Sequence, residues 1–284
     1  MLPSIPQRAI YKWLFRLFIV LFFVYLVAPL LVVAVFAFND SQFAALPWKG
    51  FTSLWFFGDA EPHLGLFHDR GLMVAMGNSL FNATMVTILA LVVGTTTAFL
   101  FERYEFPGKS FVYILMIAPL VVPGVIIGIS VLVFSSSIAN GLESRYGWTV
   151  QFLRPGTFLV VLGQFSFIAT IATMVIAARL RKFDRSLEEA ALNLGATPAV
   201  VFRTITLPFL VPALVGSGVV SFLMSFENFS TSLMLVGSNP PLTVAMFERM
   251  RMGSSPSLNA VSLFLMVGST ILGLLSLAVE RKRG

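Results

Sequence analysis

The sequence contains no cysteine and little charge. Without a Cys among its 284 residues, the chain cannot form disulfides, thiolate metal sites or a cysteine nucleophile. Charged residues make up only 11% of the chain and apolar residues 57%, with a mean hydropathy of +0.89. Because about a quarter of the residues in a soluble globular domain are charged, this composition predicts a membrane protein.

Six apolar runs have the length of membrane spans, which need about 20 mostly apolar residues. They are Leu17–Phe38, Gly77–Leu100, Phe111–Ser136, Thr157–Ala178, Phe209–Leu235 and Leu258–Val279. The first run is too long for a signal-peptide core and lacks a convincing cleavage site, so we expect it to be a true span. The sequence therefore predicts an all-α membrane protein with six transmembrane helices.

Basic residues are distributed unevenly between the flanks of these runs. Thirteen of the 19 lie at the two termini and in alternate loops, and six lie in the opposite, longer loops. The thirteen are Arg8, Lys12, Arg16, Arg103, Lys109, Arg179, Arg181, Lys182, Arg185, Arg203, Arg281, Lys282 and Arg283. The positive-inside rule then places both termini and the hairpin 186–208 in the cytoplasm. Because the basic residues form no aromatic-interleaved patch, the net charge of +6 does not predict nucleic-acid binding.

The longest external loop, Asn39–Ala75, is rich in Trp, Phe, Gly and Pro. We favour the interpretation that its aromatic residues rest at the outer face of the bilayer, and a docking surface for an external protein is the alternative. His63 and His68 lie five residues apart with Asp69 beside them. Histidines are common in surface loops and no further ligand is evident, so we predict no metal site.

The third apolar run contains Pro119, Pro123 and Gly124. Proline inside a membrane helix frees a carbonyl group and kinks or breaks the helix. Two interpretations are open here, namely a broken helix beside a transport path and a kink that serves packing alone.

The hairpin between the fourth and fifth runs reads "SLEEAALNLGATPAVVFRTITLP", from Ser186 to Pro208. The spacing of Ser186 and Glu189 is that of a capping box and predicts the start of a short helix. Gly195 is expected to end this helix in the left-handed conformation. Thr197 and the proline after it are expected to cap and begin a second helix that runs to the fifth span. This pattern predicts a short capped helix at the cytoplasmic face.

The same hairpin resembles the EAA motif of ABC-importer permeases, in which every position is filled. The matching residues are Glu189, Ala190, Ala191, Gly195, Ile205, Leu207 and Pro208. The similarity extends from about Asn78 to Val279, and the segments "GNSLFNATMV" and "VSFLMSFENFSTSLMLVG" are similar to the spermidine/putrescine branch of type I permeases. The resemblance implies that the short helix is a coupling helix that docks on an ATPase subunit.

This resemblance also implies a fold, partners and a location. It implies one transmembrane permease domain over residues 1–284, with a core at about 77–279 and the type I importer fold. The expected partners are two ATP-binding cassette subunits, a periplasmic solute-binding protein and a second permease subunit, as a homologous partner or as a second copy. ATP and Mg would be used by the ATPase, with no cofactor bound by this chain and no catalytic residue in it. The expected location is the bacterial inner membrane.

One acidic residue, Glu227, lies inside the six predicted spans. Ionisable groups within a bilayer are costly and usually face a cavity or a partner. On a continuous helix, Glu227 stands where a hydroxyl- and amide-lined face meets an apolar face, and nearby aromatic rings suit a cation–π contact. The candidate path residues are Glu227, Asn228, Thr231, Ser221, Phe226 and Phe229. The alternative is a role for Glu227 in assembly alone.

The solute is less well defined than the family. The polyamine branch usually has an acidic pair where this sequence has Glu227-Asn228, so one carboxylate is missing. The predicted function is uptake of a polyamine or a related amine. The alternatives are a permease for an amino acid, sulfonate or phosphonate, an ion-coupled secondary transporter, and a membrane scaffold.

Overall fold

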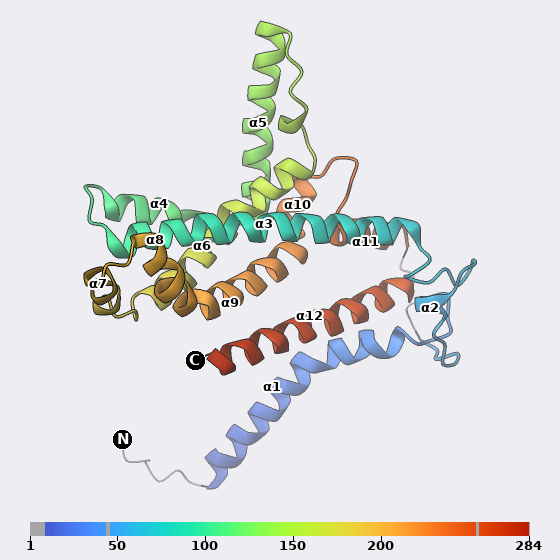
Figure 1. Ribbon diagram of the computed structural model, residues 1–284. Coiled ribbons are helices and arrows are strands. Elements are labelled where there is room, and N and C mark those ends of the chain that lie inside the picture. Colours follow the sequence, from blue (N-terminus) through green and yellow to red (C-terminus); the bar gives the residue numbers. More distant parts are fainter. Residues whose placement is uncertain (1–8, 44–45, 254–255, 284) are drawn as a thin grey trace. The chain divides into compact units, whose positions relative to one another are not determined.

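The computed structural model describes residues 9–43, 46–253 and 256–283, and in these ranges the chain is almost entirely helical (Figure 1). The helices are α1 Ala9–Phe36, α2 Leu54–Phe57, α3 Arg70–Arg103, α4 Lys109–Val121, α5 Gly124–Tyr146, α6 Thr157–Leu180, α7 Ser186–Asn193, α8 Pro198–Val201, α9 Leu207–Phe226, α10 Ser230–Leu235, α11 Leu242–Met252 and α12 Pro256–Arg283, with a 3-10 turn at Gln151–Leu153 and a π turn at Phe202–Thr206. Within the described ranges the only β pairing is an isolated bridge between Asn39 and Phe51.

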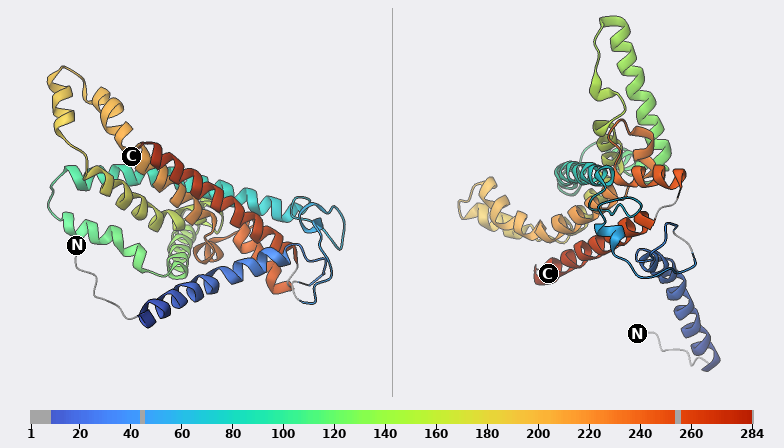
Figure 2. Two further views of the ribbon diagram at one scale, coloured as in Figure 1. Left: turned by 90° about the horizontal axis from the view of Figure 1, so that it is seen from below. Right: turned by 90° about the vertical axis from the view of Figure 1, so that its right-hand side faces the viewer.

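The described residues form two compact units. Unit one is drawn from Met1–Arg70 and Arg249–Val267, and unit two from Gly71–Glu248 and Gly268–Gly284. Unit two holds α3 to α10, and α5 projects away from its other helices in both views that show its length (Figures 1 and 2). The single permease domain expected from the sequence stays a prediction.

In the part of the chain that the structure describes, six helices are long and apolar enough to cross a membrane, as predicted. They are Ile10–Phe36, Arg70–Arg103, Gly124–Tyr146, Thr157–Leu180, Pro198–Phe226 and Pro256–Ser276. The third differs most from its predicted bounds, because the predicted run Phe111–Ser136 is divided into α4 and α5.

The break between α4 and α5 lies at Val122 and Pro123. Val122 is extended, with φ −80° and ψ 127°, which is the conformation that a following proline favours. Thr170 of α6 donates a hydrogen bond to the Met116 carbonyl at 2.7 Å, and Thr231 of α10 donates to the Gly124 carbonyl at 3.2 Å. The helix is broken rather than kinked, and hydroxyl groups tie both sides of the break to neighbouring helices. That the break lies beside a transport path stays a prediction.

The fifth predicted run is also divided, which the sequence analysis did not anticipate. α9 ends at Phe226 and α10 begins at Ser230, so Phe209–Leu235 is not one continuous helix. α10 packs against glycines of α5 and α6. A Cβ on Gly128 would lie 2.8 Å from the Met234 Cβ, and one on Gly163 would lie 2.5 Å from a Leu235 methyl group. The missing side chains therefore make room for this short helix.

The external loop in unit one is folded against itself. Trp55 is 2% exposed, and its Nε1 donates to the Asn39 carbonyl at 2.8 Å. His63 Nε2 lies 2.9 Å from Asp40 Oδ1, and Asp69 forms a bidentate ion pair with Arg249. Among the described residues no three His, Cys, Asp or Glu side chains gather to hold a metal. Whether this loop rests on the bilayer or receives a protein stays open.

The orientation of the spans is open to a direct test, because the chain has no native cysteine. We predict that a membrane-impermeant maleimide applied to intact cells labels His63→Cys and leaves Thr197→Cys unlabelled until the membrane is permeabilised. The expectation follows from the thirteen basic residues on the predicted cytoplasmic side. External labelling at position 197, or none at position 63 in a folded protein, would contradict the predicted topology.

Candidate functional site

The hairpin 186–208 holds the short helix α7, whose two ends are fixed by different hydrogen bonds. Its start differs from the predicted capping box, because Ser186 is already helical and makes no side-chain cap. Instead the Asp184 carboxylate accepts the backbone N–H of Ser186 at 2.9 Å. Hydrogen bonds from the Ser186 hydroxyl and then from its N–H keep the pKa of Asp184 below its ordinary value. The predicted helix is present, but Arg185 precedes its first residue, and the carboxylate of Asp184 rather than the Ser186 hydroxyl accepts a backbone N–H at its start.

The end of α7 is a Schellman motif around Gly195. Gly195 has φ +86°, as predicted, and its N–H binds the Leu192 carbonyl at 2.9 Å. The N–H of Ala196 binds the Ala191 carbonyl at 3.1 Å, which is the longer of the two bonds that define the motif. Left-handed backbone costs a residue with a β-carbon about 1–2 kcal/mol, so glycine is the favoured residue here.

The second helix of the hairpin starts at Thr197 and Pro198, as predicted, although the Thr197 hydroxyl makes no capping bond. It passes through the π turn, in which the Leu207 N–H reaches back to the Phe202 carbonyl, and continues into α9. Pro208 follows immediately and supplies no N–H. A π turn at this position changes the helical register where the proline interrupts the usual bonds.

The structure brings most residues of the EAA motif together on α7 and at the start of α9. Of the seven, Glu189, Ala190, Gly195 and Pro208 are exposed, and the other three are half-buried. Leu194, at a position where the EAA motif does not specify the residue, is 89% exposed. α7 therefore presents a surface of small, acidic and apolar side chains away from the rest of unit two, at one end of its helices (Figure 1).

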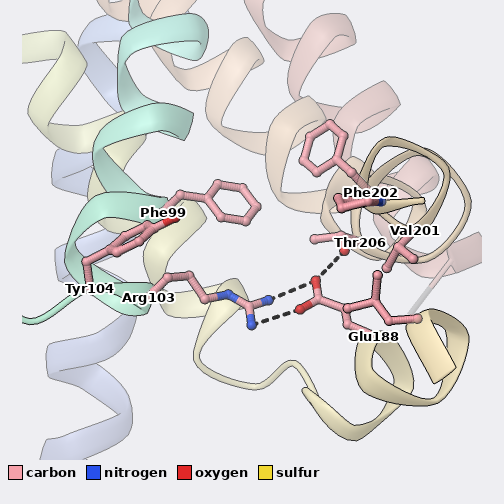
Figure 3. Close-up of a pocket in the computed structure, with 9 residues that line it drawn as sticks. Phe99, Arg103, Tyr104, Glu188, Val201, Phe202 and Thr206 are labelled. Atoms are coloured by element: carbon pink, nitrogen blue, oxygen red, sulfur yellow. Dashed lines mark hydrogen bonds and ion pairs between the residues drawn. The ribbon is translucent and has the colours of Figure 1, made fainter. Parts of the chain in front are cut away.

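Glu188, which the sequence analysis did not single out, is the acidic residue of α7 that faces inward. Its carboxylate forms a fork-like ion pair with Arg103 of α3, at 3.0 Å for Nη2 to Oε1 and 2.9 Å for Nη1 to Oε2. The Thr206 hydroxyl donates to Oε1 from the last residue of the π turn. Figure 3 shows these three side chains converging beside a surface cavity of about 440 Å³.

Two arginines after α6 also join the hairpin to the end of α3. Arg181 Nε donates to the Glu102 carboxylate at 2.7 Å, and Arg185 donates to the Glu102 backbone carbonyl at 2.6 Å. The second bond satisfies one of the carbonyls that a helix end leaves free. The hydrogen bond and charge of Glu102 raise the pKa of Arg181 above its ordinary value. The cytoplasmic end of α3 is thus the platform on which the hairpin rests.

The second candidate site is the break in the fifth span. Glu227 is the residue that ends α9, where its N–H binds the Leu223 carbonyl at 3.0 Å, and its side chain is exposed. The continuous helical wheel predicted from the sequence is therefore wrong beyond Phe226. Of the other candidate path residues, Ser221 and Thr231 are buried and Phe226, Asn228 and Phe229 are half-buried. Thr231 is engaged by its bond to α5, so it does not line a continuous polar face with Glu227.

Asn228 explains why α10 starts where it does. Its Oδ1 accepts the Ser232 N–H at 3.3 Å, and its backbone carbonyl accepts the hydroxyls of Ser232 and Thr243, each at 3.0 Å. A side-chain acceptor for a backbone N–H competes with continuation of the helix. Asn228, where the sequence analysis noted a missing carboxylate, therefore binds the first turn of α10, and Phe229 lies between it and the first residue of that helix.

Gln164 of α6 connects the two sides of this break. It is 1% exposed, its Nε2 donates to the Ser232 hydroxyl at 2.8 Å, and its Oε1 accepts the Ser225 hydroxyl. Ser225 lies in α9 and Ser232 in α10, so one amide group fixes both helices. The carboxylate of Glu227 is thereby held at a defined helix end.

The sequence of the chain is similar to those of known transport proteins. Residues 90–284 match the family of binding-protein-dependent transport system inner membrane components. The chain belongs to this family. The putrescine transport system permease protein of Escherichia coli K12 is 32% identical over 89% of this chain and 86% of its own length. The spermidine/putrescine transport system permease protein of the same organism is 28% identical over 94% and 93%.

A solved structure shares the fold of this permease. A bacterial alginate ABC transporter, in complex with an alginate pentasaccharide-bound periplasmic protein, superposes with a TM-score of 0.72 at 19% identity, covering 96% of this chain and 94% of that chain. The permease is therefore a multi-pass membrane subunit of an ABC importer, and a separate ATPase hydrolyses ATP. Its EAA motif and coupling helix are typical of the family, which decides against an ion-coupled transporter and a scaffold.

Proposed function

We propose that this permease imports polyamines, and that the break in its fifth span is the point at which the path recognises their positive charge. The observation that carries the proposal is the position of Glu227 at the C-terminal end of α9. A helix C-terminus bears a partial negative charge, so a carboxylate at that end is a poor stabiliser of the helix and a good binder of cations. Both features favour an ammonium group in the path.

The surroundings of Glu227 support the same choice of solute. Phe226 and Phe229 precede and follow it closely, and Phe229 packs on Phe247 with ring centroids 4.9 Å apart. Aromatic faces attract ammonium groups, so they complement a carboxylate in binding an amine. Broken helices that place their ends toward the solute are a recurrent design of transporter sites.

An anionic solute is the contrasting candidate. A molybdate/tungstate transport system permease protein of Thermococcus kodakarensis is 28% identical to the chain over 62% of its length. An oxyanion would meet the carboxylate and the helix C-terminus with unfavourable electrostatics. The two polyamine permeases also match over a larger part of the chain. These observations favour the cation, and amino acids, sulfonates and phosphonates stay as alternatives.

The proposed assembly follows the EAA motif. We infer that α7 docks with its exposed residues on an ATPase subunit that uses ATP and Mg, and that a second permease subunit completes the path. A periplasmic protein delivers the solute, and the location is the bacterial inner membrane. The similarity to a putrescine transport system permease and to a transporter solved with a periplasmic protein supports these partners, and the exposed, sharply terminated α7 supports the docking.

The test of the solute is an uptake assay on the complete transporter. The complex is purified with the subunits it retains, placed in proteoliposomes with its binding protein, and supplied with ATP. We expect uptake of radiolabelled putrescine or spermidine and none of molybdate or a neutral amino acid. Uptake of the anion or the amino acid, without uptake of either polyamine, would refute the proposal.

A further inference from the structure

Among the described residues of α7, Glu188 is the one whose side chain forms hydrogen bonds or ion pairs with two other helical segments. Its ion pair reaches the end of α3, 85 residues earlier, and its bond from Thr206 reaches the π turn that leads into α9. Glu189, its neighbour in the EAA motif, is exposed. The two adjacent acids thus have different surroundings, one facing solvent and one facing the permease itself.

The ion pair is held in a fixed geometry. The side chains of Arg103 and Glu188 are 15% and 22% exposed, and Thr206 is 1% exposed. The Arg103 guanidinium lies 5.9 Å from the Phe99 ring centre and 5.5 Å from that of Phe183. A fork-like arginine–carboxylate pair permits few relative orientations, so a displacement of α7 is transmitted to the ends of both partner helices.

We propose that Glu188 is the positioning residue that makes α7, the end of α3 and the start of the fifth span move as one body. This inference rests on the proposed docking of α7 on an ATPase subunit. When that subunit displaces α7, the pull on Thr206 acts on the π turn, directly before Pro208. The register of a π turn is less regular than that of an α-helix, so α9 changes its angle at this turn.

Loss of the Glu188 contacts leaves α7 attached to the permease by other means. The bonds of Arg181 and Arg185 to Glu102 still hold the hairpin on α3. Among the described residues, the hydrogen bond between an α7 side chain and the fifth span is the one from the Thr206 hydroxyl to Glu188. The complex is therefore expected to assemble without Glu188, and its ATP hydrolysis is expected to proceed without moving α9.

The test compares Glu188→Gln with Glu105→Gln in the reconstituted transporter. Glu105 lies between α3 and α4 and forms an i,i+4 ion pair with Lys109 at the surface. Its loss therefore removes an ion pair of little energetic value. We expect Glu188→Gln to lower the number of polyamine molecules imported per ATP about tenfold, within the range of coupling between distant sites, with the ATPase subunits retained. Glu105→Gln is expected to keep the wild-type ratio.

Two further variants distinguish the loss of this positioning role from misfolding of the protein and from failure of α7 to dock on the ATPase. Thr206→Val removes only the hydroxyl and is expected to lower the same ratio about threefold. Leu194→Arg, on the exposed end of α7, is expected to release the ATPase subunits. Retention of those subunits by Leu194→Arg overturns the docking proposal. Release by Leu194→Arg together with wild-type ratios in both Glu188→Gln and Thr206→Val overturns the positioning role alone.

Discussion

Replacing Glu227 with glutamine is expected to raise the KM for polyamine uptake about tenfold or more, because a contact between opposite charges is worth about 1–4 kcal/mol between bulk water and a protein surface. The substitution keeps the shape of the side chain and its capacity for hydrogen bonds while it removes the charge. Glu227 is exposed at the end of α9, so the variant is expected to assemble normally. The measurement is initial uptake as a function of solute concentration, together with ATP hydrolysis without solute.

Glu248→Gln is the matched control for this experiment. Glu248 is an exposed acid in the segment between the fifth and sixth spans, outside the break, and its loss is expected to leave KM within twofold of wild type. If Glu227→Gln transports with a wild-type KM, the charge has no part in recognition. If it loses the second permease subunit instead, Glu227 serves assembly, which is the alternative that the sequence left open.

The second large effect is expected from Gly195→Val. Valine is β-branched, and φ +86° is a conformation that such residues essentially avoid. Nothing lies within 4 Å of a Cβ built on Gly195, so the cost comes from the backbone rather than from a clash. The end of α7 is expected to unwind, which loosens the surface that docks on the ATPase. Uptake is expected to fall at least tenfold, in line with a loss of about 1–2 kcal/mol or more.

Gly108→Val is the matched control for Gly195→Val, because it places a similar backbone strain outside the hairpin. Gly108 has φ +80° and also has nothing within 4 Å of a Cβ, but it precedes α4 and lies outside the EAA motif. Gly195→Asn is the conservative variant, because asparagine tolerates the left-handed conformation. We expect both to keep most of the uptake. Equal losses in Gly108→Val and Gly195→Val would mean that the effect is general destabilisation.

Local features of the hairpin could be predicted from the sequence because neighbouring residues determine them. Gly195 and the pair Thr197–Pro198 were placed correctly, since backbone conformation and the missing proline N–H act within a turn. The start of α7 lies one residue earlier than predicted, because Ser186 is its first helical residue rather than its cap, and both Asp184 and Ser186 are residue types that favour a helix start. Only the structure shows which of them meets a free N–H.

Contacts between distant segments could not be predicted in the same way. The pair of Arg103 and Glu188 joins residues 85 apart, and in the sequence the EAA motif drew attention to Glu189 instead. The one available signal for this ion pair was Arg103, a basic residue just after the second predicted span. The break after Phe226 was hidden because only Glu227 and Asn228 interrupt a long run of apolar and hydroxyl residues, and Asn228 was the available sign of a new helix start.

The break between α4 and α5 has a consequence for the order in which this permease is completed during synthesis. α4 has 13 residues and is about 20 Å long, which is short of the about 30 Å of a bilayer core. The hydroxyl that binds the Gly124 carbonyl belongs to Thr231, which the ribosome adds 107 residues later. At about 5–20 residues per second, the nascent α5 waits roughly 5–20 s for this partner. The middle of the protein therefore reaches its final packing only after the fifth span has entered the membrane.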